Sequence, residues 1–136
     1  MRAITARVTK GMNLGCIMKV ADNSGGKLAK LVGVFGGKST RGRQFKAGVS
    51  DLVKVSIKKA TDIEMRKKVF PAVIIRQRKE YRRLTGERIS FADNACVILK
   101  DEKNPQNPKG TEIKGPIARE VAERWDFVAK IARIIV

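Results

Sequence analysis

The side chains best suited to chemistry in this sequence are cationic, and they occur in clusters. Arginine and lysine bind phosphate by charge and by hydrogen bonds. In the run from Arg76 to Lys79, alternate residues of a strand point the same way, which places Arg76 and Arg78 about 6.6–7 Å apart. This separation is close to the phosphate spacing of one nucleic-acid strand. The candidate RNA-binding residues are Lys38, Arg41, Arg43, Lys46, Arg66, Lys67, Lys68, Arg76, Arg78, Lys79, Arg82, Arg83 and Arg88.

Charge runs are usually solvated surface, and that remains the alternative for these clusters. Two facts favour binding: the runs recur, and few acidic residues accompany them. The chain has 136 residues with 30 Lys+Arg and 13 Asp+Glu, a net charge of +17. Residues 1–100 hold 23 basic and 7 acidic residues (+16), and residues 101–136 hold 7 and 6 (+1). The phosphate-facing surface is therefore predicted on the first hundred residues, and a different role on the rest.

Motifs for nucleotide binding or catalysis are weak in this sequence. The stretch from Gly33 to Thr40 resembles a phosphate-binding loop, but such a loop needs four residues between its first glycine and Gly-Lys-Ser/Thr, and this chain has three. Asp22 and Asp93 are each followed by asparagine, which is typical of Asx turns rather than of a paired-carboxylate site. The sequence contains no histidine, the usual general base. We therefore expect no enzyme activity and no cofactor.

The two cysteines, Cys16 and Cys96, lie in apolar stretches 80 positions apart. This pattern favours two small buried side chains in a reducing compartment over a disulfide, a metal site or a nucleophile. Residues 1–13 have no apolar signal core, and no apolar run is long enough to span a bilayer. The sequence predicts a cytoplasmic protein whose partners include neither membrane nor DNA.

The elements that must position the basic side chains are short strands separated by turns. With 43% apolar residues the chain can form a core, and we expect a single domain over residues 1–136, with a basic barrel in 1–100. Strongly turn-forming residues at 22–26 and a hairpin turn at Thr85-Gly86 separate the strands. The spacing favours a mainly β fold with a small closed five-stranded β-barrel. The predicted strands are residues 14–21, 27–35, 49–59 with Val49, Val53, Val55 and Ile57 inward, 69–75, and 87–99 as one strand interrupted at 92–94.

Residues 101–136 are predicted to form a near-neutral loop followed by one or two short helices. Gly115-Pro116 suits a helix start, and an apolar stripe runs from Ile117 to Ile135. Pairs at Glu120/Arg124 and Asp126/Lys130 are expected on the solvent side. Either the segment only closes the barrel, or it also presents a mixed-charge surface for protein docking. The candidate docking residues are Thr111, Glu112, Arg119, Glu123 and Arg124.

The aromatic residues bear on how RNA would be bound. There are seven of them, and only Tyr81 and Phe45 lie in contexts polar enough to expect an exposed ring. Proteins that bind single strands need exposed aromatic platforms. Recognition of folded RNA by shape and phosphate is therefore favoured over sequence reading.

Three blocks of the sequence resemble the universal large-subunit ribosomal protein family L-fourteen, in its archaeal and eukaryotic branch. The first is Ala72-Val73-Ile74-Ile75, followed at family spacing by Thr85-Gly86, Phe91, Asn94 and Val97-Ile98. The others are residues 20–25 and 115–120. Thr85 departs from the family pattern, which usually has Asp, Asn or Ser there, so a slightly different turn is expected.

The resemblance implies a structural constituent of the large ribosomal subunit that binds large-subunit rRNA at the subunit interface. It also implies bridges to small-subunit rRNA, the neighbouring proteins L-three and L-twenty-four-e, and docking of the anti-association initiation factor six. The alternative is a free basic β-barrel translation factor or RNA chaperone. That class would carry a cluster of surface aromatic residues, which this sequence lacks.

Overall fold

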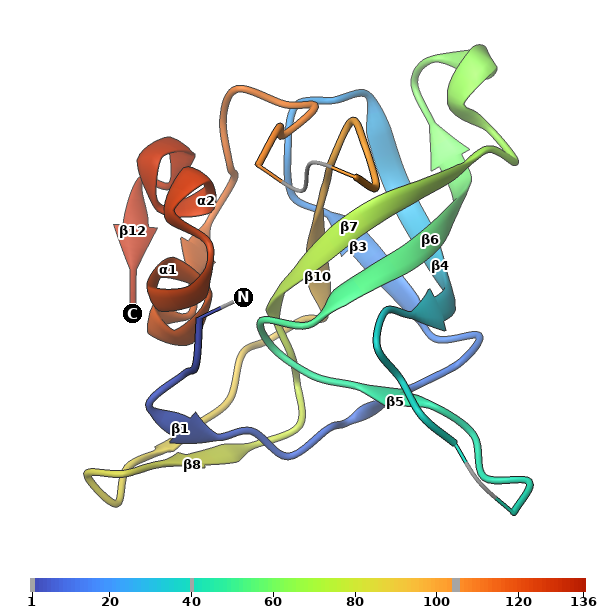
Figure 1. Cartoon of the computed structure of the whole chain (residues 1–136). Helices are drawn as coiled ribbons and strands as arrows, with labels where there is room; N and C mark the ends of the chain where they lie inside the picture. The colour runs from blue at the N-terminus through green and yellow to red at the C-terminus, as the bar shows by residue number, and fades with distance from the viewer. Residues whose placement is uncertain (1, 40, 104–105) are drawn as a thin grey trace.

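A closed five-stranded barrel forms the centre of the computed structural model, which describes residues 2–39, 41–103 and 106–136 (Figure 1). Around the barrel the strands are β10 (Ala95–Ile98), β3 (Ile17–Val20), β4 (Gly26–Val34), β6 (Leu52–Ala60) and β7 (Val69–Arg76). Neighbouring strands are antiparallel, except β10 and β3, which run parallel. The predicted mainly β fold with a closed five-stranded barrel is confirmed.

Alternating side chains fill the inside of the barrel. In β6, Val53, Val55 and Ile57 point inward and are fully buried, as predicted. Val49 was predicted on the same face, but it is buried in a second cluster outside the barrel. The reason is a turn before β6, in which the Asp51 N–H bonds the Gly48 carbonyl and Ser50 adopts φ 72°.

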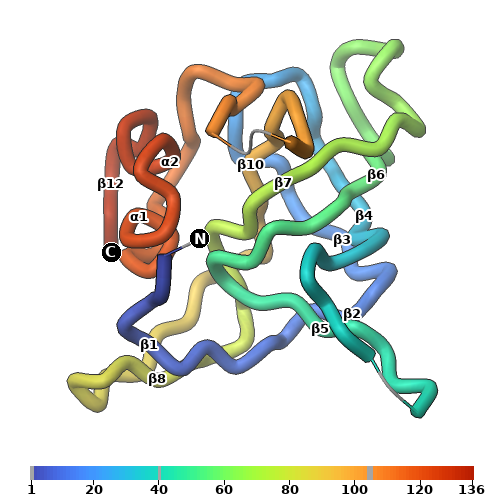
Figure 2. The backbone as a smooth tube through the Cα atoms, viewed as in Figure 1, coloured from blue at the N-terminus to red at the C-terminus, as the bar shows by residue number. Residues whose placement is uncertain are grey.

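The second core lies between the barrel wall and the C-terminal segment. Strands β7 and β10 are buried on both faces, which explains why their sequences are continuously apolar. The C-terminal helices α1 (Arg119–Arg124) and α2 (Asp126–Ile131) cover them from one side of the barrel (Figure 2). The helical stripe is buried as predicted at Ile117, Val121, Trp125 and Val128, whereas Ile135 is half-exposed.

The start of the C-terminal segment differs from its prediction. Pro116–Ile117 does not begin a helix; it forms strand β11, which pairs in parallel with β12 (Ile134–Ile135), and α1 begins at Arg119. The Arg76 guanidinium holds this backbone by donating to the Lys114 and Pro116 carbonyls at 3.0 and 2.8 Å. Gly115 between them has φ 84°, and a Cβ there would lie 2.9 Å from Arg76 Nη1.

Two small sheets flank the barrel. One consists of β1 (Ala6–Arg7), β8 (Tyr81–Arg83) and β9 (Arg88–Ile89), and the other of β2 (Met12–Asn13) and β5 (Lys46–Ala47). The predicted turn at Thr85-Gly86 joins β8 to β9, with Gly86 at φ 92°. A short 3₁₀ helix, η1 (Ile63–Met65), lies between β6 and β7.

Residues 87–99 were predicted to form one bent strand, and this is wrong. Strand β9 belongs to the flanking sheet and β10 to the barrel. The segment between them is held by side chains: Asp93 pairs with Arg76, and the Asn94 amide oxygen accepts from the Arg78 N–H at 2.8 Å.

Candidate nucleic-acid interface

Three arginines lie side by side across the sheet of β1, β8 and β9. Arg7 is directly opposite Arg82, and Arg82 is directly opposite Arg88. We call these three residues the arginine row. All three are exposed, because the other face of β8, formed by Tyr81 and Arg83, is buried. Like charges directly opposite each other destabilise a sheet. A bound anion would reduce the repulsion among these three arginines.

Few acidic residues neutralise the positive charge around the arginine row. Arg88 forms an exposed ion pair with Glu80 at 3.0 Å, while the neighbouring Arg78 and Lys79 are exposed. Among the described residues, no ion pair involves Arg7, Arg78, Lys79 or Arg82. The sequence predictions missed Arg7, since its place in the row depends on pairing with a strand 75 positions away.

Arg76 was predicted to face phosphate beside Arg78, and the structure corrects this. Arg76 is only 8% exposed, and its Nε bonds Asp93 Oδ1 at 2.8 Å. Burial would raise the pKa of Asp93, but the hydrogen bond and charge of Arg76, with a contribution from Lys19, lower it below its usual range. Arg76 therefore anchors the C-terminal segment to the barrel, and only Arg78 of this pair lies on the surface.

Arg83 requires a second correction of the same kind. It is 7% exposed, and its Nε lies 2.7 Å from Glu120 Oε1 on α1. The Tyr81 hydroxyl donates to the other oxygen of Glu120 at 2.7 Å. Glu120, predicted on the solvent side with Arg124, is thus buried; desolvation would raise its pKa, but the bonds from Arg83 and Tyr81 outweigh it and lower the pKa. This buried cluster ties the hairpin to α1.

The predicted basic loop forms a second cationic surface. Lys38, Arg41, Arg43 and Lys46 are all exposed, and Thr40 lies outside the described residues. Lys38, Arg43 and Lys46, together with Lys10, line a cleft of about 670 Å³. The described residues after Lys38 form turns and then β5, not the helix that a nucleotide-binding loop would require.

The third predicted cluster, Arg66, Lys67 and Lys68, is exposed between η1 and β7. Next to it the structure places four lysines that the sequence predictions missed: Lys27, Lys30, Lys58 and Lys59, on the outside of β4 and β6. The signal was present, because lysine recurs at strand positions whose neighbours are apolar. The alternation also predicts that Lys54 and Lys58 point outward, but this outer surface was not included among the candidate RNA-binding residues.

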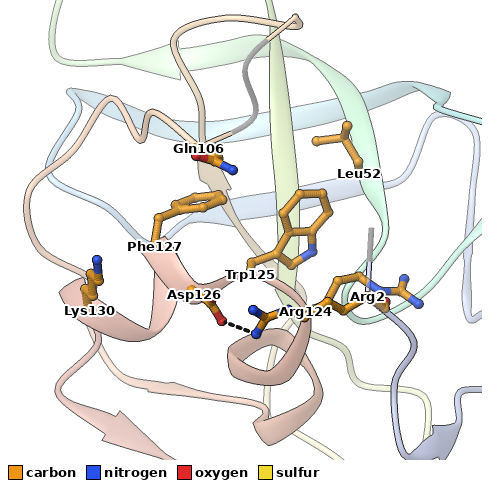
Figure 3. A pocket seen from close by; sticks show the side chains of 8 residues that line it. All are labelled: Arg2, Leu52, Gln106, Arg124, Trp125, Asp126, Phe127 and Lys130. Carbon is orange, nitrogen blue, oxygen red and sulfur yellow. Dashed lines mark hydrogen bonds and ion pairs between the residues drawn. The ribbon is translucent and has the colours of Figure 1, made fainter.

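Two of the predicted docking residues hold the N-terminal arm. Glu123 accepts hydrogen bonds from the backbone and hydroxyl of Thr5 at 2.9–3.2 Å, and Arg124 Nε donates to the Arg2 carbonyl at 2.8 Å. Close by, Asp126 pairs with Arg2 at 3.0 Å and not with Lys130, the partner predicted for it (Figure 3). A pocket of about 650 Å³ opens here, with Trp125, Phe127 and Lys130 in its wall.

The other docking candidates lie elsewhere on the C-terminal segment. Thr111 bonds Asn23, beyond the end of β3, through both its backbone and its hydroxyl. Glu112 forms an exposed ion pair with Arg133, and Arg119 is exposed at the start of α1. The structure therefore does not gather the five predicted residues into one patch.

The remaining reactive side chains serve the fold. Asp22 forms an Asx turn, as predicted, because its carboxylate accepts a hydrogen bond from the Ser24 N–H at 3.0 Å. It also accepts one from the Ile98 N–H at 2.7 Å. Cys96 is fully buried, Cys16 is partly buried, and both are free thiols; burial raises the pKa of each. Across the described residues no cluster of metal-ligating side chains occurs, and no helix there has the length and apolar character needed to cross a membrane.

Comparison with known proteins gives matches over nearly the whole chain. The family model for ribosomal protein L14p/L23e covers residues 11–136. The large ribosomal subunit protein uL14 of Nanoarchaeum equitans is 49% identical, that of Halorubrum lacusprofundi 48% and that of Methanocella arvoryzae 47%. Each alignment spans 136 residues and 100% of both chains. With its three sequence blocks, its five-stranded barrel and these full-length matches, the chain belongs to the ribosomal protein L14p/L23e family.

Proposed function

We propose that this protein is a structural constituent of the large ribosomal subunit in the cytoplasm and binds large-subunit rRNA through phosphate contacts. The observation that carries the proposal is the arginine row, in which Arg7, Arg82 and Arg88 lie directly opposite one another on exposed strands. Bidentate arginine contacts to phosphate offset the repulsion within the row. The exposed cations of the 38–46 loop and of the segment 66–68 extend the same interaction.

The relatives' names support the assignment to the large subunit. A place at the subunit interface, with bridges to small-subunit rRNA, follows from the family resemblance and forms part of the proposal. The proposal also includes contacts with the neighbouring proteins L-three and L-twenty-four-e, and docking of the anti-association initiation factor six, which the family resemblance implies as well. Of the candidate docking residues, Arg119 suits this role best, because it is exposed and contributes no side-chain bond to the fold among the described residues.

Salt dependence of rRNA binding tests the phosphate contacts. If six to ten phosphates are neutralised, the affinity of the chain for large-subunit rRNA falls roughly 10³–10⁵-fold between 50 and 200 mM salt. Arg82→Gln is expected to reduce the slope of log K against log salt by about 1. Arg133→Gln, an exposed arginine in the near-neutral segment, is the matched control and leaves the slope unchanged. Binding that does not depend on salt would contradict the proposal.

Two further measurements separate the alternatives. Cosedimentation with large subunits at rising salt distinguishes a constituent from a free translation factor or RNA chaperone, which would leave the subunits at moderate salt. Arg119→Glu is expected to weaken binding of factor six while leaving rRNA affinity and its salt slope unchanged. If that variant instead lost rRNA and kept the factor, the docking proposal would be wrong.

A further inference from the structure

A buried amide side chain, that of Gln77, lies where three segments of the chain meet. Gln77 directly follows β7 and is 0% exposed. Burying an amide costs free energy unless its donors and its acceptor are hydrogen-bonded. The partners of this side chain therefore indicate what it does in the protein.

The Gln77 amide bonds the backbone of all three segments. Its Oε1 accepts from the Val49 N–H at 3.0 Å. Its Nε2 donates to the Thr9 carbonyl at 2.9 Å and to the Lys79 carbonyl at 2.8 Å. Both N–H groups and the carbonyl of the amide are thus used, and the orientation of the amide is fixed because its nitrogen alone can donate to two carbonyl groups.

The segments that Gln77 joins lead to the two cationic surfaces described above. Thr9 lies between Arg7 of the arginine row and Lys10, which lines the cleft at the loop of residues 38–46. Val49 follows β5, the strand at the base of this loop. The third segment leads into β8, which carries the centre of the row. Gln77 therefore connects the row to the base of the loop through direct bonds to the backbone of each.

Two glycines allow these segments to converge on Gln77. A Cβ at Gly11 would overlap the Lys79 side chain, and a Cβ at Gly48 would lie 2.9 Å from Val8 Cγ1 and 3.2 Å from Gln77 Oε1. The backbones thus approach one another with no room for a side chain between them. The position of one segment consequently determines the positions of the others.

The arginine row has a second attachment to the fold, whereas the base of the loop depends more on Gln77. Glu120 holds the buried face of β8 through Tyr81 and Arg83. Strand β5 pairs with β2 in a two-stranded sheet, and the segment between β1 and β2, which Gln77 holds, runs from the corner with β8 to the corner with β5 (Figure 2). Loss of the Gln77 bonds is expected to release the base of the loop and leave the row in place.

We propose that Gln77 is a positioning residue for rRNA binding, which fixes the base of the 38–46 loop relative to the arginine row so that both surfaces contact phosphates of one RNA fold. Binding costs less free energy when its contact groups are already held at the required spacing. Gln77 carries no charge and is buried, so it acts through the backbone that it holds. This inference rests on the proposed function.

The salt dependence of rRNA binding by Gln77→Met tests this role, because the substitution removes all three bonds and leaves the net charge of +17 unchanged. If the displaced loop loses two or three phosphate contacts, the slope of log K against log salt falls by about 2–3, near 0.9 per contact. In hydroxyl-radical footprinting, Gln77→Met is expected to lose the same protected nucleotides as a variant without the loop cations (Lys38→Gln, Arg43→Gln, Lys46→Gln). It should keep the protection that Arg82→Gln loses.

Asn23→Leu is the matched control for the loss of a bridging amide. The Asn23 side chain also holds a distant segment through three hydrogen bonds, two with Thr111 and one with the Glu112 N–H, but it lies away from the loop and the row. Its slope and footprint should match the wild type. Val55→Ala, which removes volume from the barrel interior, controls for lost stability, because a smaller folded fraction lowers the affinity by one factor at every salt concentration.

The outcomes distinguish this inference from the proposed function. If the wild type protects no rRNA, the proposed function fails. If the wild type protects rRNA but Gln77→Met keeps its footprint and slope, or only loses affinity equally at every salt concentration, the positioning role alone is wrong. Loss of the row's protection together with that of the loop, or full protection by the loop-cation variant, would also overturn it. Gly48→Ala, whose Cβ would press against Gln77 Oε1 without changing a charge, should give a smaller decrease in slope and serves if Gln77→Met does not fold.

Discussion

Replacing Glu120 by glutamine is expected to destabilise the protein strongly, because Glu120 contacts the buried face of β8, behind the exposed face that carries Arg82 of the arginine row. The Glu120 side chain is 2% exposed and accepts from Arg83 Nε and from the Tyr81 hydroxyl, each at 2.7 Å. Glutamine keeps the shape but removes the charge. In addition, its amide NH₂ faces either Arg83, which cannot accept a hydrogen bond, or the Tyr81 hydroxyl, which would have to accept instead of donate. The Arg83 guanidinium, 7% exposed, would then be buried without a counter-charge.

The magnitude follows from the burial of both partners. Removing one member of a buried ion pair costs about 3–5 kcal/mol in the free energy of unfolding. That is a large part of the 5–15 kcal/mol that holds a typical domain folded. Tyr81→Phe leaves the ion pair intact and removes one hydrogen bond to a charged acceptor, for a smaller loss of about 1.5–3 kcal/mol.

Urea unfolding at pH 7, followed by circular dichroism, measures these differences. The matched control is Glu102→Gln, because Glu102 also pairs with a cation, Lys54, but with side chains 41% and 47% exposed. Exposed ion pairs contribute about 0–1 kcal/mol, so the control should stay close to the wild type. Equal losses for Glu120→Gln and Glu102→Gln would refute the reasoning that the cluster of Tyr81, Arg83 and Glu120 joins the hairpin to α1.

Three further predictions concern pH, loop dynamics and thiol chemistry. The fold lowers the pKa of both Glu120 and Asp93, so the stability that they contribute is complete above about pH 4, near the ordinary pKa of carboxyl groups, and is lost as pH falls through the lowered pKa values. The stability of Glu120→Gln should therefore depend less on pH in acid, and an acid-unfolding curve parallel to that of the wild type would contradict this. Amide exchange in the loop 38–46 should be fast in the free protein and slow in the rRNA complex, and equal protection in both states would contradict the proposed contact. Cys96, fully buried with a raised pKa, should react with a thiol reagent only on unfolding, whereas Cys16 should react slowly in the folded protein, as mass spectrometry of the labelled chain would show.

The barrel could be predicted from the sequence because its signals are local. Alternation along 49–59 identified the inward side chains of β6, and Thr85-Gly86 identified the β8–β9 turn, since both features depend on residues next to one another in the chain. The helical stripe that includes Val121 and Val128 is local in the same sense. Errors arose where a distant side chain decides the backbone, as when Arg76 holds Lys114 and Pro116 in an extended conformation.

The candidate interface was predicted less completely, for a related reason. Whether an arginine faces solvent or a buried carboxylate depends on the partner that the fold brings to it. Arg82 and Arg83 are adjacent in the sequence, yet one lies in the exposed row and the other pairs with Glu120. Strand alternation predicts that the two point in opposite directions. It does not predict that α1 covers one face of β8, or that Arg7 lies beside Arg82.

The near-neutral charge of residues 101–136 is explained by what its carboxylates contact. Four of its six acidic residues bind groups in residues 1–100, and these are Glu102 with Lys54, Glu120 with Arg83, Glu123 with Thr5, and Asp126 with Arg2. The acids of this segment therefore attach it to the basic barrel and neutralise cations on the side that it covers. They do not reach the arginine row, for which no ion pair with this segment occurs among the described residues. The uneven distribution of charge along the sequence thus becomes an uneven distribution on the surface, because most acidic residues of this segment lie where the chain packs on itself, whereas at the arginine row the ion pair among the described residues is that of Glu80 with Arg88.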